Sequence, residues 1–221
     1  HRQVLATIVE ELKGDPAVSG VLLQGSVARG DHSPGSDLDL LVLLQPGTSR
    51  PLQSELRAGI LVETHHSTAP ELTSSVATRP SLAYGIRDGQ VQYDRTGEIT
   101  ALMQAATEAL QTYRTPAKEL RAIRYWLYAA KVKLLAALNA SDETRAGLLA
   151  SINTWKTLEG LWAVNHLPTP PGGAVLTYLQ ELELLPPHFP ELLAALSTGT
   201  ARERALACST MITWLLEQEP A

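Results

Sequence analysis

The pattern of apolar and polar positions divides the chain into a first part that contains strands and a second part that is almost entirely helical. Apolar residues recur near helical spacing within residues 2–13, which predicts a helix there. Alternating or continuous apolar runs predict strands at residues 18–25, 36–44 and 59–67. The sequence YGIRDGQVQYD at residues 84–94 has an Asp-Gly pair between short alternating runs, which predicts a β-hairpin.

From residue 98 onward the apolar spacing is helical, and we predict helices at 98–113, 116–139, 142–165, 173–184, 189–197 and 201–218. Strands followed by helices predict an α+β fold, with a small mixed β-sheet head, flanking helices and a C-terminal helical bundle. We place the domain boundary in YRTPAKE, which separates a head at 1–114 from a bundle at 115–221. The bundle core is predicted to contain the four tryptophans, Trp126, Trp155, Trp162 and Trp214.

Composition narrows the class of protein without naming a function. The chain has 221 residues, of which 44% are hydrophobic and 19% charged, and its net charge is −5. These values are ordinary for a globular protein and give no general attraction to nucleic acid or to anionic membranes. The single cysteine, Cys208, excludes an internal disulfide framework and suits a reducing compartment. No apolar run is long enough to span a bilayer, and no signal-peptide core opens the chain, so we expect a cytoplasmic location without membrane partners.

Candidate chemistry begins where a polar stretch meets an apolar strand. Asp37 and Asp39 are two residues apart on a predicted strand, so both carboxylates leave the same face. Their Cα atoms should be roughly 7 Å apart, from a rise of about 3.3 Å per residue. That spacing lets them share one cation or bridge two cations about 3.5–4 Å apart. Oxygen ligands of this kind suit Mg²⁺ first, although a solvated strand start is the alternative interpretation.

A second feature lies upstream, where Gly25 and Ser26 end a predicted strand and begin a short predicted helix. The backbone N–H groups at such a helix start, together with the helix dipole, favour a phosphate. A glycine allows the backbone to approach that phosphate closely, and the serine hydroxyl can donate to it. Arg29 follows on the same helical side and can add a charge-assisted contact. A phosphate cradle beside a carboxylate pair indicates a nucleoside triphosphate.

The motif Gly-Ser-x-Ala-Arg-Gly, followed by Ser-Asp-x-Asp and an apolar strand, resembles the signature of the DNA polymerase β-like nucleotidyltransferase superfamily. This resemblance implies that Gly25 and Ser26 hold triphosphate oxygens and that Asp37 and Asp39 bind two Mg²⁺ ions. It implies a third carboxylate from a later strand, and Glu63 in LVETH is the match, although the family more often has aspartate there. The motifs cover about residues 18–65.

More loosely, a small head followed by a helical bundle is similar to antibiotic nucleotidyltransferases of the kanamycin, streptomycin/spectinomycin and lincosamide types, and to minimal nucleotidyltransferases. In such two-domain enzymes a basic or aromatic bundle residue often faces the nucleotide. Lys131, which shares a helical face with Tyr128, therefore joins Arg29 and Ser36 as a candidate nucleotide-binding residue. The alternative is a set of core aromatic residues with a solvated lysine at its edge.

The resemblance implies transfer of a nucleoside monophosphate, first of all AMP from ATP, to the hydroxyl of a small-molecule acceptor such as an aminoglycoside. Glu63, or a bundle glutamate such as Glu119 or Glu159, would accept the hydroxyl proton. Open alternatives are an antitoxin-like enzyme that AMPylates protein, an inactive nucleotide-binding module and a structural partner protein. A homodimer is also left open. The sequence has no basic stripe with interleaved aromatic residues, which argues against a nucleic acid acceptor.

Overall fold

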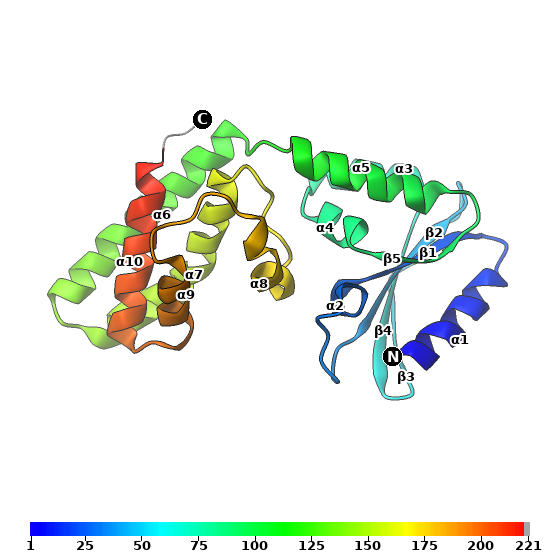
Figure 1. The fold of residues 1–221 in the computed structure, drawn as a ribbon, viewed down its shortest axis with the longest axis horizontal. Coiled ribbons are helices and arrows are strands. Elements are labelled where there is room, and N and C mark those ends of the chain that lie inside the picture. Colours follow the sequence, from blue (N-terminus) through cyan, green and yellow to red (C-terminus); the bar gives the residue numbers. More distant parts are fainter. Residues whose placement is uncertain (219–221) are drawn as a thin grey trace. The chain divides into compact units, whose positions relative to one another are not determined.

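The computed structural model describes residues 1–218, which form two compact units (Figure 1). The first unit consists of His1–Thr112 together with Pro170–Ala174. The second consists of Tyr113–Thr169 and the chain from Val175 onward. The α+β fold class is confirmed, since a mixed sheet is followed by C-terminal helices. The division into a catalytic head at 1–114 and a cleft-closing bundle at 115–221 stays a prediction.

The sheet of the first unit has five strands in the order β3-β4-β2-β1-β5. The strands are β1 Val18–Gln24, β2 Leu38–Leu44, β3 Gln53–Arg57, β4 Ile60–Ser67 and β5 Gln90–Asp94. Only β2 and β4 pair in parallel, and the other neighbours are antiparallel. The central strand β2 and its neighbour β1 are buried almost throughout, which explains the continuous apolar runs in their sequences.

Helices cover both faces of this sheet. Ile8 and Val9 of α1 (Arg2–Lys13) pack on the face that includes Val21 and Leu40. On the other face, α4 and α5 contact β1, and Ile99 of α5 lies against Gly20. The helices on this second side are α3 Ala69–Thr78, α4 Leu82–Arg87 and α5 Glu98–Thr112. Burial on both faces makes the middle of the sheet a rigid base for the side chains at its ends.

The predicted hairpin at residues 84–94 is wrong. The chain there forms the end of α4 and then β5, and Asp88 lies between them. Gly89 is required for a different reason, because a Cβ atom there would lie 2.6 Å from Cγ of Leu22. The glycine therefore permits close packing on β1, and the Asp-Gly pair is not a hairpin turn.

A hairpin that the sequence pattern did not reveal joins β3 to β4. Its two-residue loop is Ala58-Gly59, and the φ angles of these residues are 51° and 79°. Two positive φ angles define the type I′ turn that suits the twist of paired strands. The usual Asn-Gly or Asp-Gly signal is absent because alanine occupies the first position, although alanine rarely adopts positive φ. As a result, β3 could not be recognised from its own polar sequence.

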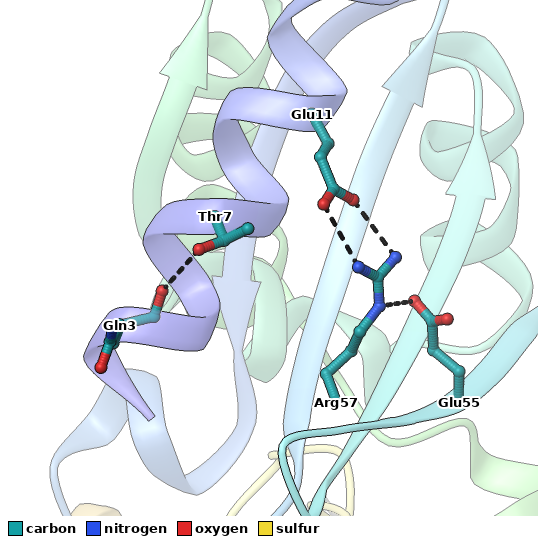
Figure 2. Close-up of polar contacts among 5 residues, drawn as sticks. All are labelled: Gln3, Thr7, Glu11, Glu55 and Arg57. Atoms are coloured by element: carbon teal, nitrogen blue, oxygen red, sulfur yellow. Dashed lines mark hydrogen bonds and ion pairs between the residues drawn. The ribbon is translucent and has the colours of Figure 1, made fainter.

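Arg57 fastens this hairpin to α1 (Figure 2). Its Nη1 and Nη2 each donate to one carboxylate oxygen of Glu11 at 3.2 Å, and its Nε donates to Glu55 at 2.8 Å. The fixed fork of a guanidinium matches a carboxylate in this way. Exposed pairs of this kind add little stability, because water and salt screen the two charges. The ion pairs instead fix direction: they hold the charged side chains of β3 on the side of the sheet that faces α1.

The second unit is built from helices, as predicted. Its long helices α6, α7 and α10 pack against one another, and α9 packs on α10. Their bounds are α6 Ala117–Asn139, α7 Glu143–Val164, α9 Phe189–Thr198 and α10 Ala201–Glu217. Trp162 lies in the core as predicted, whereas Trp126 and Trp155 are exposed, so the core prediction is wrong for these two. None of the helices within residues 1–218 combines the length and apolar character needed to cross a bilayer.

The continuous helix predicted at 173–184 is instead a series of short turns: Gly172–Ala174, α8 Val175–Tyr178 and Leu179–Glu181. The end of this segment is bound by a side chain from α7's C-terminal cap. Oδ1 of Asn165 accepts hydrogen bonds from the amides of Glu183 and Leu184, and its Nδ2 donates to the Leu184 carbonyl. A side-chain amide that binds backbone groups competes with helix formation. This contact fixes the chain just after the last of these turns.

The contact between Gly20 and Ile99 gives a test of how tightly α5 packs on the sheet. A Cβ atom at Gly20 would lie 2.6 Å from Cδ1 of Ile99. We therefore expect Gly20→Ala to lower the free energy of unfolding by about 1–3 kcal/mol in urea titrations. Gly35→Ala is the control, since nothing lies within 4 Å of its added methyl group. In an Ile99→Ala background the cost of Gly20→Ala should shrink, and an undiminished cost would contradict this packing.

Candidate active site

Three acidic side chains meet at one end of the sheet. Asp37 precedes β2, Asp39 lies on β2 and Glu63 lies on β4. The parallel register of β2 and β4 pairs Asp39 with Glu63, so both side chains leave the same face. One carboxylate oxygen from each of the three residues lies within 4.8 Å of the others, and all three residues are half-buried. The structure thus brings together the three carboxylates that the sequence selected.

This donor set fits a divalent cation. The ligand atoms are all carboxylate oxygens, which hard cations such as Mg²⁺ and Mn²⁺ prefer over softer metals. Within residues 1–218, Asp37, Asp39 and Glu63 are the only group of acidic, histidine or cysteine side chains with this mutual spacing. Three oxygens supply half of an octahedral shell, which leaves positions for water and substrate oxygens.

The surroundings of Asp39 destabilise its negative charge. Its pKa is raised from the ordinary value of 3.8, first because the carboxyl group is buried, and then because Asp37 and Glu63 repel its charge. Electrostatic interactions with His65 and Arg29 oppose the rise in the pKa of Asp39 only in part. A carboxylate that is both desolvated and next to like charges is stabilised by a bound cation. The electrostatics therefore agree with the chemistry of the donor set.

Gly25 makes the Asp39 carboxylate possible at this position. The φ angle of Gly25 is +70°, and a Cβ atom there would lie 2.0 Å from Oδ2 of Asp39. Gly25 begins α2 (Gly25–Arg29) directly after β1, whose last residue Gln24 pairs with Asp39. Gly30 then ends α2 in the left-handed conformation at φ 83°. The Gly-Ser motif and the Asp-x-Asp motif are thus in direct contact.

The other predicted nucleotide-binding residues of the first unit surround this contact. Ser26 lies in the first turn of α2 and is half-buried. Arg29 forms an ion pair with Asp31 at 3.2 Å, so its charge is shared with a neighbouring acid. The Ser36 hydroxyl accepts a hydrogen bond from the Ser33 amide at 2.9 Å and shapes the loop before Asp37. Contact of Ser26, Arg29 or Ser36 with a nucleotide stays a prediction.

The candidates on the helical bundle lie in the second unit. Lys131 is half-buried on α6, and Tyr128 one turn earlier is exposed. Glu119 lies in the first turn of α6, and Glu159 on α7 forms an ion pair with Lys156. The roles of Lys131, Glu119 and Glu159 at the nucleotide or the acceptor stay predictions.

The strand register adds residues that sequence reasoning did not assign to the site. His65 follows Glu63 by two positions on β4, is exposed, and lies close enough to Asp39 to act on its charge. Alternation along the strand places His65 on this face, but alternation alone gave it no role. β3 pairs Ser54 with Glu63 and Leu56 with Leu61. No sequence signal could have found these neighbours, since β3 itself was not recognised.

Comparison with known proteins agrees with this geometry. The family described as "Nucleotidyltransferase domain" matches residues 3–135, which is more than half of the chain. The chain therefore belongs to the nucleotidyltransferase domain family, and the protein is a nucleotidyltransferase. The resemblance to the DNA polymerase β-like superfamily is confirmed.

A solved structure supports the same fold. The chain is similar to a nucleotidyltransferase-like protein from Exiguobacterium sibiricum 255-15, with 14% identity and a TM-score of 0.50. That alignment covers 97% of this chain and 74% of the other chain. At this identity the likeness concerns the fold alone. No curated protein matches the chain.

The charge repulsion at Asp39 predicts a gain in stability when the charge is removed. Without divalent cations, Asp39→Asn should raise the melting temperature at pH 7 by about 2–4 °C, the shift that about 1 kcal/mol produces in a chain of this size. The same variant should lose the stabilisation that Mn²⁺ or Mg²⁺ gives the wild-type protein. Differential scanning fluorimetry with EDTA and with each metal measures both effects.

The pH dependence of that difference follows from linkage. Because folding raises the pKa of Asp39, the stability linked to its protonation is complete below the unfolded value, near 3.8, and is lost as the pH rises through the folded pKa. The gap in melting temperature between Asp39→Asn and the wild type should therefore be near zero at about pH 3.5–4 and widen toward pH 7. A gap that is constant with pH would contradict charge repulsion as its cause.

Gly25 and Gly30 both have positive φ angles, but only Gly25 lies against Asp39. Comparing substitutions at the two positions therefore distinguishes the effect of the Asp39 contact from the effect of backbone strain. Gly25→Ala and Gly30→Ala both force a methyl group onto positive φ, which costs about 1 kcal/mol or more. Only Gly25→Ala meets Asp39, since nothing lies within 4 Å of a Cβ at Gly30. We expect Gly25→Ala to lose Mn²⁺ stabilisation in thermal melts and Gly30→Ala to keep it. Equal loss in both variants would show that the contact with Asp39 is unimportant.

Proposed function

We propose that the protein transfers a nucleoside monophosphate, first of all AMP from Mg·ATP, to a hydroxyl group of a small-molecule acceptor. The observation that carries this proposal is the contact between Gly25 and the carboxylate of Asp39, because it joins a phosphate-type turn to an acid cluster. Either feature alone is common. Side by side, they suit the triphosphate of a nucleotide and the cations that accompany it.

The positions of the residues suggest two roles, cation binding by the carboxylates and phosphate binding at the start of α2. Asp37, Asp39 and Glu63 would hold two Mg²⁺ ions, which supply charge neutralisation at the triphosphate and acidify the acceptor hydroxyl. The amides that follow Gly25 and the hydroxyl of Ser26 would bind phosphate oxygens at the start of α2. Because these groups lie on a rigid sheet and its first turn, their main contribution would be positioning and charge complementarity.

The reaction balances with one proton transfer. The acceptor oxygen forms a bond to the α-phosphorus while the bond from that phosphorus to pyrophosphate breaks in line. The hydroxyl proton passes to a carboxylate, and Glu63 is our candidate because it lies at the edge of the acid group farther from α2 in the strand order. Pyrophosphate leaves with the electron pair of the broken bond, so it carries one more negative charge than the same group had in the nucleotide, and the bound cations would neutralise that charge.

The test combines binding with turnover. We expect Mg²⁺ with one of the four NTPs, ATP first, to raise the melting temperature, and pyrophosphate to be released when an acceptor from an aminoglycoside and lincosamide panel is added. Asp39→Asn and Glu63→Gln should each lower pyrophosphate release by about 10³-fold, since several kcal/mol of electrostatic stabilisation are lost.

Glu55→Gln is the matched control, because Glu55 lies on the same hairpin but pairs with Arg57 on the α1 side. It should leave pyrophosphate release within about twofold of the wild type, as expected for an exposed pair. A protein whose melting temperature responds to no NTP would refute the proposal. Binding of Mg·ATP without pyrophosphate release for any small molecule or protein hydroxyl would favour the inactive nucleotide-binding module.

A further inference from the structure

The face of the β3–β4 hairpin beside Glu63 is apolar and exposed. Leu61 precedes Glu63 by two residues on β4, so the two side chains share a face about 7 Å apart. Leu56 on β3 is the register partner of Leu61, which places both leucines next to each other on that face. The exposed fractions are 73% for Leu56 and 38% for Leu61. We call these two side chains the leucine pair.

The leucine pair does not serve the core of the fold. Along β4, Ile60 and Val62 alternate with Leu61 and pack into the core beneath α1. Leu56 and Leu61 point to the opposite face, which also carries Asp39 and Glu63. A single exposed leucine is ordinary, but two adjacent leucines beside a half-buried acid group form an apolar surface at a site.

The charges of the hairpin lie on its other face. Glu55 and Arg57 alternate with Leu56, and Arg57 is bound to Glu55 and to Glu11 of α1 (Figure 2). On the face of the leucine pair, β3 contributes only the neutral Ser54 opposite Glu63. The one carboxylate here is therefore Glu63, which already belongs to the acid group. A polycationic ligand would find no further acid on this face of the hairpin.

The order of the strands separates the two sides of the acid group. Gly25 and α2 reach Asp39 from β1, whereas Glu63 and the leucine pair lie on β4 and β3, beyond β2 on the other side. A nucleotide bound at α2 would occupy the β1 side. The acceptor hydroxyl must approach from another direction to attack in line, and the β4 side brings it past Glu63 and Leu61.

We propose that the leucine pair is the acceptor subsite and that the acceptor is an uncharged or singly charged hydroxyl compound with an alkyl or other apolar group next to the reacting hydroxyl. This inference rests on the proposed function, and it narrows the acceptor class away from polycationic aminoglycosides. The apolar group lies on Leu56 and Leu61 while the hydroxyl reaches Glu63. Each CH₂ group buried there should strengthen binding by about threefold to fourfold.

The probes are methyl, butyl and hexyl β-glucosides, which share their sugar hydroxyls and differ only in alkyl length. Each is titrated into the full chain with Mg²⁺ and a non-hydrolysable ATP analogue, and the leucine methyl signals are followed by ¹³C NMR. We expect the Leu56 and Leu61 methyl signals to shift, with affinity rising by at least about tenfold from methyl to hexyl glucoside, which is the gain from about two buried CH₂ groups. Kanamycin, a polycationic aminoglycoside, should bind more weakly than hexyl glucoside.

Leu56→Ser and Leu61→Ser should each weaken hexyl glucoside binding by about tenfold and leave methyl glucoside and nucleotide binding unchanged. Val91→Ser is the matched control, because Val91 is 44% exposed on β5, at the opposite edge of the sheet. It should leave the whole glucoside series unchanged. Thermal melts of all three variants verify that they are folded.

Three results would overturn the proposal: no dependence on alkyl length, tighter binding of kanamycin than of hexyl glucoside, or leucine methyl signals that no glucoside shifts. Failure of the proposed function has a different signature, which is the absence of Mg·ATP stabilisation in the wild-type melts. A flat glucoside series in a protein that binds Mg·ATP therefore refutes the leucine subsite alone.

Discussion

Repulsion among three carboxylates is the constraint on which the site depends. Asp37, Asp39 and Glu63 hold oxygens within 4.8 Å of one another in half-buried positions. Burial and the two neighbouring charges raise the pKa of Asp39, so the metal-free group is held at an energetic cost. Carboxylates on flexible loops would move apart to lower that cost. The surrounding structure must therefore hold Asp39 and Glu63 in place. A bound cation would relieve the repulsion, and the relief would add to the free energy of cation binding.

The sheet provides that rigidity. β1 and β2 are buried on both faces, and the parallel pairing of β2 with β4 fixes Asp39 beside Glu63. A slip of one residue in that pairing would turn Glu63 to the opposite face, where the core beneath α1 excludes a charge. The bidentate contact of Arg57 with Glu11 holds the edge of the same sheet against α1. The packing and register of the sheet therefore also determine the geometry of the site.

The predictions from sequence are wrong where a local signal has a cause in the tertiary structure. The Asp88-Gly89 pair has the composition of a turn, but Gly89 is present because Leu22 packs against it. The true hairpin was hidden because Ala58 occupies a position of positive φ where asparagine or glycine is expected. The helix predicted at 173–184 is a series of short turns, and the side chain of Asn165 binds the backbone just after them. Helical spacing likewise could not show which tryptophans would be buried, and Trp126 and Trp155 are exposed.

The sequence alone was sufficient to identify the family, the α+β class and the acid group, since the two motifs are local. Gly25-Ser26 follows one strand, and Asp37 and Asp39 lie two residues apart at the start of the next, where period-two alternation decides their common face. Tertiary structure decided what depends on pairing between distant segments. The β2–β4 register placed Glu63 beside Asp39, Gly25 was brought against the Asp39 carboxylate, and β3 added Leu56 next to Leu61. Strand order and register arise from packing of the whole sheet, which no window of local sequence contains.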